Sequence, residues 1–75
     1  MSRKYAVIYE QGPTSIGAYV PDLPGCVAAA ETMEQVQKLI REAIQLHLAG
    51  MAEDGLPIPE PGTQCEYVDA SEPAV

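Results

Sequence analysis

The first thirty residues contain three short stretches in which apolar and small side chains alternate as they do in β-strands. Residues 4–10 (KYAVIYE) alternate between two sets that are both fairly apolar, which predicts a central strand covered on both faces. Residues 15–20 (SIGAYV) predict a second strand that ends at Pro21, because proline cannot donate to a β-ladder. Residues 25–30 (GCVAAA) predict a third. The N-terminal part should therefore form a β-meander.

The pattern then changes from a period of two to the period of a helix. Thr32 and Gln35, in the stretch TMEQ, have the spacing of a capping box, which predicts that the helix begins after Thr32. Gly55, after Glu and Asp, is expected at the position just beyond the helix end. The apolar side chains of the helix recur every three or four positions and should face the sheet. They are Val36, Leu39, Ile40, Ala43, Ile44, His47, Leu48 and Met51.

The last twenty residues combine alternating prolines with one further apolar stretch. Residues 56–62 (LPIPEPG) favour an extended polyproline conformation, and residues 64–69 (QCEYVD) predict a final strand. The predicted order is thus β-β-β-α-β, an α+β fold with one helix packed on a small, mainly antiparallel sheet. We expect residues 1–70 to form a single domain and residues 71–75 to form a flexible tail.

Size and composition suggest that this domain has a small core. The chain has 75 residues with no Trp, no Phe and four Tyr, so small aliphatic side chains must fill the interior. We therefore expect a homo-oligomer, a dimer or higher, that uses an exposed strand edge or the helix. No apolar run approaches the roughly 20 residues of a membrane helix. The N-terminus does not resemble a signal peptide, which predicts a cytoplasmic protein.

Charge is distributed unevenly along the chain. Residues 1–41 contain four basic and four acidic side chains, whereas residues 42–75 contain seven acidic and no basic ones, so the net charge of −7 lies in the second half. Such a chain is poorly suited to binding phosphate backbones, and no direct contact with nucleic acid is expected. The acidic half suits a basic protein partner, although a simple contribution to solubility explains it equally well.

Little in the sequence suggests catalysis. Cys26 and Cys65 are 39 positions apart and are expected to be two buried thiols. Together with His47 they lack the spacing of a zinc site, and no metal or other cofactor is expected. His47 lies on the apolar side of the helix, where a packed histidine is the simpler interpretation. Nothing brings several carboxylates onto neighbouring strand centres, as two-metal nuclease chemistry requires. The sequence therefore predicts no catalytic residues and no enzyme.

The stretch PDLPG, between the second and third predicted strands, allows two interpretations. It can be a rigid corner, in which Pro21 ends a strand, the carboxylate of Asp22 accepts turn amides, and Gly25 follows Pro24 with a positive φ. It can also be a binding loop that displays Leu23 as an apolar knob and Asp22 as a charge. The first interpretation is favoured, and the two are compatible.

Four stretches in this order resemble the HicB family of antitoxins and antitoxin-like small proteins: YAVIYEQG, AYVPDLPGC, ETMEQVQKLIREAIQLHL and EDGLPIPEP. The resemblance covers about residues 5–61. Its most specific elements are PDLPGC after a strand and EDG before the alternating prolines. It implies a partial, RNase H-like α+β domain that binds and neutralises HicA, a small basic toxin that cleaves mRNA and resembles double-stranded-RNA-binding proteins. Many family members also carry a C-terminal DNA-binding module, and with seven residues after Val68 we expect none here.

The expected function is therefore that of a non-enzymatic, antitoxin-like binding module for a small basic toxin. An orphan HicB-like oligomer with a structural or small-ligand-binding role and no toxin partner is the alternative. A neighbouring reading frame for a short basic protein would favour the toxin partner. The candidate partner-binding residues are those of the corner and of the acidic C-terminal stretch: Tyr19, Pro21, Asp22, Leu23, Pro24, Glu66 and Asp69.

Overall fold

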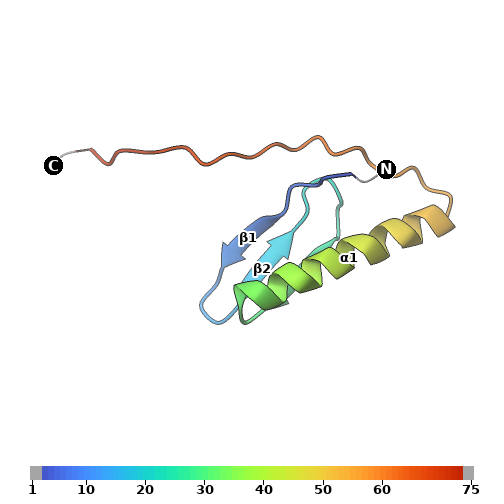
Figure 1. The fold of residues 1–75 in the computed structure, drawn as a ribbon, viewed down its shortest axis with the longest axis horizontal. Helices are drawn as coiled ribbons and strands as arrows, with labels where there is room; N and C mark the ends of the chain where they lie inside the picture. Colours follow the sequence, from blue (N-terminus) through green and yellow to red (C-terminus); the bar gives the residue numbers. More distant parts are fainter. Residues whose placement is uncertain (1–2, 74–75) are drawn as a thin grey trace.

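A three-stranded sheet with one long helix on one of its faces makes up the folded part of the chain. The computed structural model describes residues 3–73. The strands are β1 (Ile8–Gln11), β2 (Ile16–Tyr19) and β3 (Val27–Ala30), and the helix is α1 (Met33–Glu53). The sheet order is β1-β2-β3 with both pairs antiparallel, so each strand lies beside its neighbour in sequence (Figure 1). The predicted α+β fold is confirmed.

The strand register separates two faces of the sheet. Ala18 in the central strand lies opposite Tyr9 on one side and Ala28 on the other, and this row faces α1. Tyr19 lies opposite Ile8 and Val27 in the next row, which faces away from the helix because successive side chains alternate. No helix covers this second face within the described residues. We call it the open face, defined by Ile8, Tyr19 and Val27.

The core is small and lies between β2, β3 and α1. The fully buried side chains of the helix are Val36 and Ile40, and the others come from β2 and the loop that follows it. The complete set of buried residues is Ile16, Ala18, Val20, Leu23, Cys26, Val36 and Ile40. Aliphatic side chains fill this core, as the composition predicts, and aromatic Tyr5 and Tyr9 pack only at its margin.

The ends of α1 are fixed by local hydrogen bonds. The hydroxyl oxygen of Thr32 accepts from the amide of Gln35 at 3.2 Å, which satisfies one of the free amides of the first turn. At the other end Gly55 has φ of 69°, and the Leu56 amide donates to the Met51 carbonyl at 2.9 Å, as in a Schellman motif. Both predicted helix boundaries are confirmed.

The buried face of α1 is narrower than the apolar pattern suggests. The helix packs on β3 and β2 and not on β1, so only side chains that point straight at these two strands are enclosed. Leu39, predicted to be in the core, is 42% exposed, and Met33 at the helix start is equally exposed. Leu46, which lies off the predicted apolar face, is 75% exposed. A flank of the helix therefore presents leucine to solvent.

The predicted final strand is wrong. Residues 64–69 are extended but belong to no sheet, and every residue from 64 to 73 is exposed. An extended segment is stable as a strand only when a neighbour binds its backbone amides and carbonyls, and here the segment leaves the fold instead (Figure 1). The radius of gyration is accordingly 15.3 Å, whereas a compact chain of this length would have about 11 Å.

This outcome also changes the place of β1. The strand was predicted over residues 4–10 as a central strand, but without a fourth strand beside it β1 is an edge strand. The strand is shorter than predicted and spans Ile8–Gln11, the four residues that pair with Ile16–Tyr19 of β2. The domain limits 1–70 and 71–75 stay predictions, and residues 1, 2, 74 and 75 lie outside the described part. No helix within the described residues is both long and apolar enough to cross a membrane.

Candidate functional site

The loop between β2 and β3 consists of two successive tight turns. The Leu23 amide donates to the Val20 carbonyl at 3.0 Å, and the Cys26 amide donates to the Leu23 carbonyl at 3.0 Å. Gly25 has φ of 86° and follows Pro24, which is the residue order of a type II turn. Each proline in the loop stands second in its turn, where its fixed φ is compatible with the geometry. The rigid-corner interpretation is confirmed.

Leu23 is not displayed on this loop. Its side chain is 0% exposed and belongs to the core, together with Val36 and Ile40 of α1. The predicted apolar knob is therefore wrong, because the turn that Pro24 and Gly25 create directs the Leu23 side chain inward. Leu23 thus contributes to the core and not to the surface of the loop.

Asp22 joins the loop to a segment far along the chain. One carboxylate oxygen accepts the amides of Gly62 at 3.1 Å and Thr63 at 3.0 Å, and the other accepts the Thr63 hydroxyl at 2.9 Å. The bonds from the backbone and the side chain of Thr63 stabilise the charged form and hold the pKa of the Asp22 carboxyl below its ordinary value. The carboxylate was predicted to accept amides of its own turn, and this is wrong: the amides that it accepts lie 40 and 41 positions away.

Two further contacts hold the same segment, residues 59–63, which we call the return segment. The Tyr5 hydroxyl donates to the Pro59 carbonyl, and Arg3 forms an ion pair with Glu60 at 3.3 Å. The ion pair is exposed on both sides and contributes little to stability. Asp22 and Tyr5 are therefore the main attachments, and together they fix the point from which the rest of the chain departs.

The segment beyond this point, residues 64–73, is the exposed tail. It passes β1, where Cys65, Glu66 and Tyr67 line a shallow pocket with residues 7–9 and Met33. Tyr67 is fully exposed and Val68 is 73% exposed, so two large apolar side chains have few contacts with the fold. Glu66, Asp69 and Glu72 give the tail a negative charge, and it has no basic residue. The tail thus combines apolar and acidic groups on an extended backbone.

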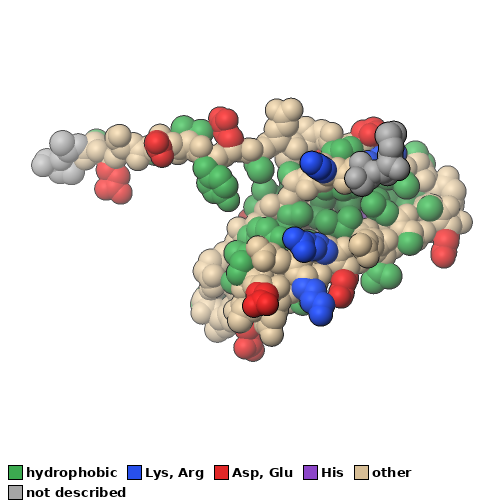
Figure 2. All heavy atoms as spheres, viewed as in Figure 1, with side chains coloured by type: hydrophobic (Ala, Val, Ile, Leu, Met, Phe, Trp, Pro, Cys, Tyr) green, Lys and Arg blue, Asp and Glu red, His purple; other side chains and the backbone are tan. Residues whose placement is uncertain are grey.

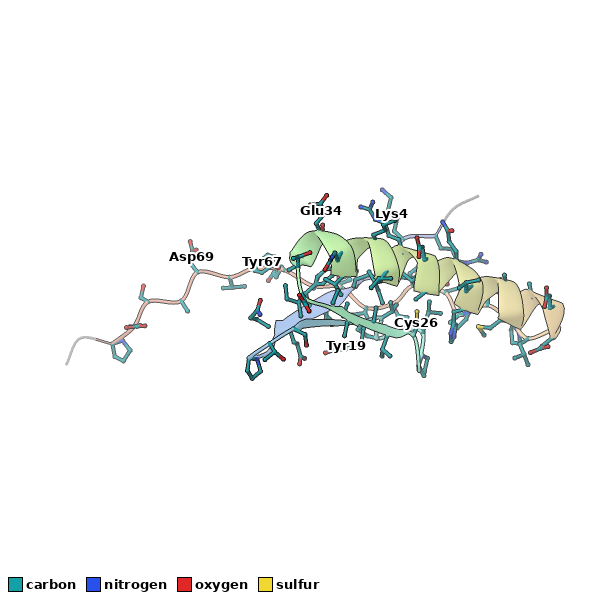
Figure 3. The ribbon with its side chains drawn as sticks, turned by 90° about the horizontal axis from the view of Figure 1, so that it is seen from below. Lys4, Tyr19, Cys26, Glu34, Tyr67 and Asp69 are labelled. Atoms are coloured by element: carbon teal, nitrogen blue, oxygen red, sulfur yellow. The ribbon has the colours of Figure 1, made fainter. Side chains whose placement is uncertain are left out.

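The predicted partner-binding residues do not form one surface. Asp22 and Leu23 are engaged within the fold, whereas Pro21 and Pro24 are exposed at the loop. Tyr19 lies on the open face, apart from Tyr67 and Asp69 on the tail (Figure 3). Two separate exposed regions, the open face and the tail, thus contain the solvent-accessible candidates.

Three exposed apolar residues of the open face and the tail were not among the predicted candidates. They are Val27 on the open face and Tyr67 and Val68 on the tail. Val27 stands directly opposite Tyr19, so the alternation of the two strands could have identified it once the register was known. Tyr67 and Val68 have the sequence pattern of a strand that pairs in a sheet, so the sequence gives no sign that their side chains are exposed.

The basic side chains all lie on the folded part of the chain, where acidic ones accompany them, whereas the tail is acidic alone. Lys and Arg side chains gather on the outer side of α1 and the adjoining N-terminal segment, whereas the tail carries only Asp and Glu (Figure 2). Lys38 and Arg41 of α1 are both exposed, but the helix also carries Glu34, Glu42 and Glu53, so charges of both signs lie on it. The acidic tail is therefore the more suitable region for a basic partner, because opposite charges accelerate encounter.

Within residues 3–73, no three side chains of His, Cys, Asp and Glu come close enough together to hold a metal ion. Cys26 is buried, as predicted, and burial raises the pKa of its thiol, which disfavours the reactive thiolate. Cys65 is exposed, so its predicted burial is wrong; it lies on the tail that leaves the fold.

Comparison with known proteins gives consistent results. Residues 5–74 match the model of a family described as HicB-like antitoxin of bacterial toxin-antitoxin systems. An uncharacterised 14.9 kDa protein of Haemophilus phage HP1 (strain HP1c1), from its rep-hol intergenic region, is 31% identical over 91% of this chain. The chain spans only 51% of that relative.

A solved structure described as the HicA3 and HicB3 toxin-antitoxin complex also resembles this fold. One of its chains matches with a TM-score of 0.69 and 27% identity, over 80% of this chain and 70% of the other. The family model covers nearly the whole sequence and includes the PDLPG corner, the capped helix and the return segment. The chain therefore belongs to the family of HicB-like antitoxins of bacterial toxin-antitoxin systems.

Proposed function

We propose that this chain is a non-enzymatic, antitoxin-like module that binds a small basic mRNA-cleaving toxin of the HicA type and blocks its active surface. The observation that carries the proposal is the family match over residues 5–74, supported by the likeness to a chain of a toxin-antitoxin complex. Because its target cleaves mRNA, the module would act in the cytoplasm.

The two exposed regions supply a plausible way to bind such a partner. The open face offers Tyr19 and Val27, which are 39% and 63% exposed, and aromatic side chains in particular contribute strongly to interfaces. The tail offers Tyr67 between the acidic Glu66 and Asp69, and nothing in the fold competes for these groups. We assign initial attraction to the acids and most of the final affinity to the apolar groups.

The extended tail would compete with RNA for the same basic surface of the toxin. An extended chain carrying carboxylates at intervals presents negative charge to a cationic groove, as a phosphate backbone does. The attachment of the return segment at Asp22 limits the volume that the tail explores. This restriction lowers the entropy that is lost on binding.

A charge-matched pair of variants tests the proposal. A small basic toxin of the HicA type would be purified, and its RNA cleavage would be measured with increasing amounts of each variant. Glu66→Lys with Asp69→Lys should weaken inhibition about tenfold or more, whereas Glu34→Lys with Glu42→Lys on α1 makes the same change in net charge and should have little effect.

Three results would contradict the proposal. The unmodified chain could fail to inhibit cleavage, it could fail to bind the toxin, or it could cleave RNA itself. If the two charge-reversal pairs weakened inhibition equally, the tail would not be the site and net charge alone would explain the interaction. Raising the salt concentration should slow association of the unmodified chain, since surface attraction is screened.

A further inference from the structure

The central strand of the sheet contains a glycine that the fold itself does not require. Gly17 lies within β2, opposite Glu10 of β1 and Ala29 of β3. Its φ is not positive, so the local backbone conformation does not call for glycine. Apart from its chain neighbours, no atom of the described residues lies within 4 Å of the position that a Cβ would occupy. Alanine would therefore fit, and it would lose less conformational entropy on folding than glycine does in a strand.

The side chain that Gly17 lacks leaves a gap in the exposed side of the sheet. Because successive residues of a strand face opposite sides, the row of Glu10, Gly17 and Ala29 faces the same side as Tyr19. Figure 3 shows Tyr19 on the side of the sheet that faces away from α1. We call this position the Gly17 gap, bounded by Glu10, Tyr19 and Ala29. It adjoins the open face and gives a partner close access to the backbone of the central strand.

The border of the Gly17 gap combines a carboxylate with an aromatic ring. Glu10 is exposed, and the ion pair in the described part of the chain joins Arg3 to Glu60, which leaves Glu10 without a basic partner there. Tyr19 stands diagonally across from Glu10, a spacing of about 7–8 Å that long side chains can span. A carboxylate and an aromatic face at this spacing suit a cationic side chain, which pairs with the first and lies against the second.

We infer that the Gly17 gap receives a lysine or arginine side chain of the partner. The aliphatic part of that side chain lies over the Gly17 backbone, its charge pairs with Glu10, and its flank contacts the ring of Tyr19. The inference rests on the proposed function, because it takes the basic toxin as the partner. A Cβ at position 17 would occupy the space that the inserted side chain uses, which is why glycine is needed. The acidic tail attracts the toxin from a distance, and the gap sets its position on the sheet.

Substitution of Gly17 separates this role from a role in folding. Inhibition of RNA cleavage by a purified toxin of the HicA type would be measured together with thermal unfolding of the full chain. Gly17→Ala should raise the melting temperature by about 2–8 °C and yet weaken inhibition about threefold, and Gly17→Val should weaken it about tenfold or more. Gly50→Ala is the matched control, because it also adds a Cβ to an uncrowded glycine but lies on α1. It should leave inhibition unchanged.

Paired substitutions in the two proteins identify the inserted side chain. Each Lys and Arg of the toxin would be replaced in turn by methionine, and calorimetry would measure binding to the unmodified chain and to Glu10→Gln. One toxin variant should bind the unmodified chain about tenfold more weakly but show little further loss with Glu10→Gln, because both changes remove the same ion pair. Glu34→Gln removes an acid from α1 instead and should show no such coupling.

Several results would overturn this inference while leaving the proposed function intact. They are full inhibition by both Gly17 variants, equal weakening by Gly17→Ala and Gly50→Ala, and the absence of coupling between Glu10 and any basic residue of the toxin. A lower melting temperature of Gly17→Ala would show that the fold does require glycine there, and would also contradict it. If the unmodified chain neither bound nor inhibited the toxin, the proposed function itself would fail, and this inference with it.

Discussion

The carboxylate of Asp22 and the backbone and side chain of Thr63 are joined by two hydrogen bonds, at 3.0 and 2.9 Å, across 41 positions of sequence. This contact connects the corner between β2 and β3 with the return segment that follows α1. The corner is therefore more than a turn, because it also determines where the chain leaves the fold. Asp22 thereby fixes the base of the exposed tail.

Removal of the Asp22 carboxylate should release the return segment while the sheet and helix remain folded. In Asp22→Ala, the amides of Gly62 and Thr63 lose their acceptor and should exchange hydrogen at least about tenfold faster, because their protection depends on this local contact. Hydrogen exchange measured residue by residue checks this. Glu10→Ala removes an exposed acid on β1 and should leave both amides unchanged. Equal protection in the two variants would show that Tyr5 and Arg3 hold the segment without Asp22.

The same contact should weaken in acid. The folded-state pKa of Asp22 lies below its ordinary value of 3.8, so the charged, bonded form stabilises the fold above pH 3.8. This stabilisation is lost as the pH falls from that value through the lowered pKa. The Thr63 amide resonance should therefore shift within this range in a pH titration. In Asp22→Asn the shift should disappear, and an unchanged titration of Thr63 would contradict the assignment.

Truncation of Leu23 should destabilise the domain strongly. Its side chain is completely buried, so Leu23→Ala should lower the free energy of unfolding by about 2–5 kcal/mol, enough to unfold much of a small domain. Leu23→Met, which nearly conserves volume, should lower it by less than about 1.5 kcal/mol. Leu56→Ala removes a leucine that is 52% exposed and serves as the control. Urea denaturation compares them. Equal effects of Leu23→Ala and Leu56→Ala would show that Leu23 is not a core residue.

Two glycines should respond in opposite directions to alanine. Gly50 lies within α1, and apart from its chain neighbours and the nearby backbone of the helix itself, no atom of the described residues lies within 4 Å of the position that a Cβ would occupy. Gly50→Ala should therefore raise the free energy of unfolding by about 0.5–1 kcal/mol. Gly25 has φ of 86°, a conformation that costs other residues about 1–3 kcal/mol, so Gly25→Ala should lower it. Thermal melting of both variants tests the contrast, and a stabilising Gly25→Ala would contradict the type II turn.

The local features of the fold could be predicted from sequence because each depends on residues close together in the chain. Alternation predicted the first two strands and a short run of small apolar residues predicted the third. The spacing of Thr32, Gln35 and Gly55 predicted both ends of the helix. Pro24 and Gly25 predicted a tight turn, since few residue pairs suit that geometry. Family membership followed from the same local patterns, because they occur in a specific order.

The errors concern features that depend on distant parts of the chain. Residues 64–69 have the alternation of a strand, but a strand forms only where a neighbour accepts its hydrogen bonds, and sequence does not report that neighbour. Leu23 sits in a loop rich in proline and glycine, and only the path of the two turns shows that its side chain enters the core. Leu39 was expected to face the sheet because of its place in the helical period, and Cys65 was expected to be a buried thiol. Burial depends on what packs against each side chain.

The sequence by itself determined the order of the first three strands and the helix, the turn chemistry and the family, because local backbone preferences and hydrophobic period are properties of neighbouring residues. Only the tertiary structure decided which surfaces remain available. It attaches Asp22 to Thr63, leaves Tyr67 and the edge of β3 exposed, and covers one face of the sheet while the other stays open. The physical reason is that exposure is set by packing between distant segments, which the sequence pattern does not specify.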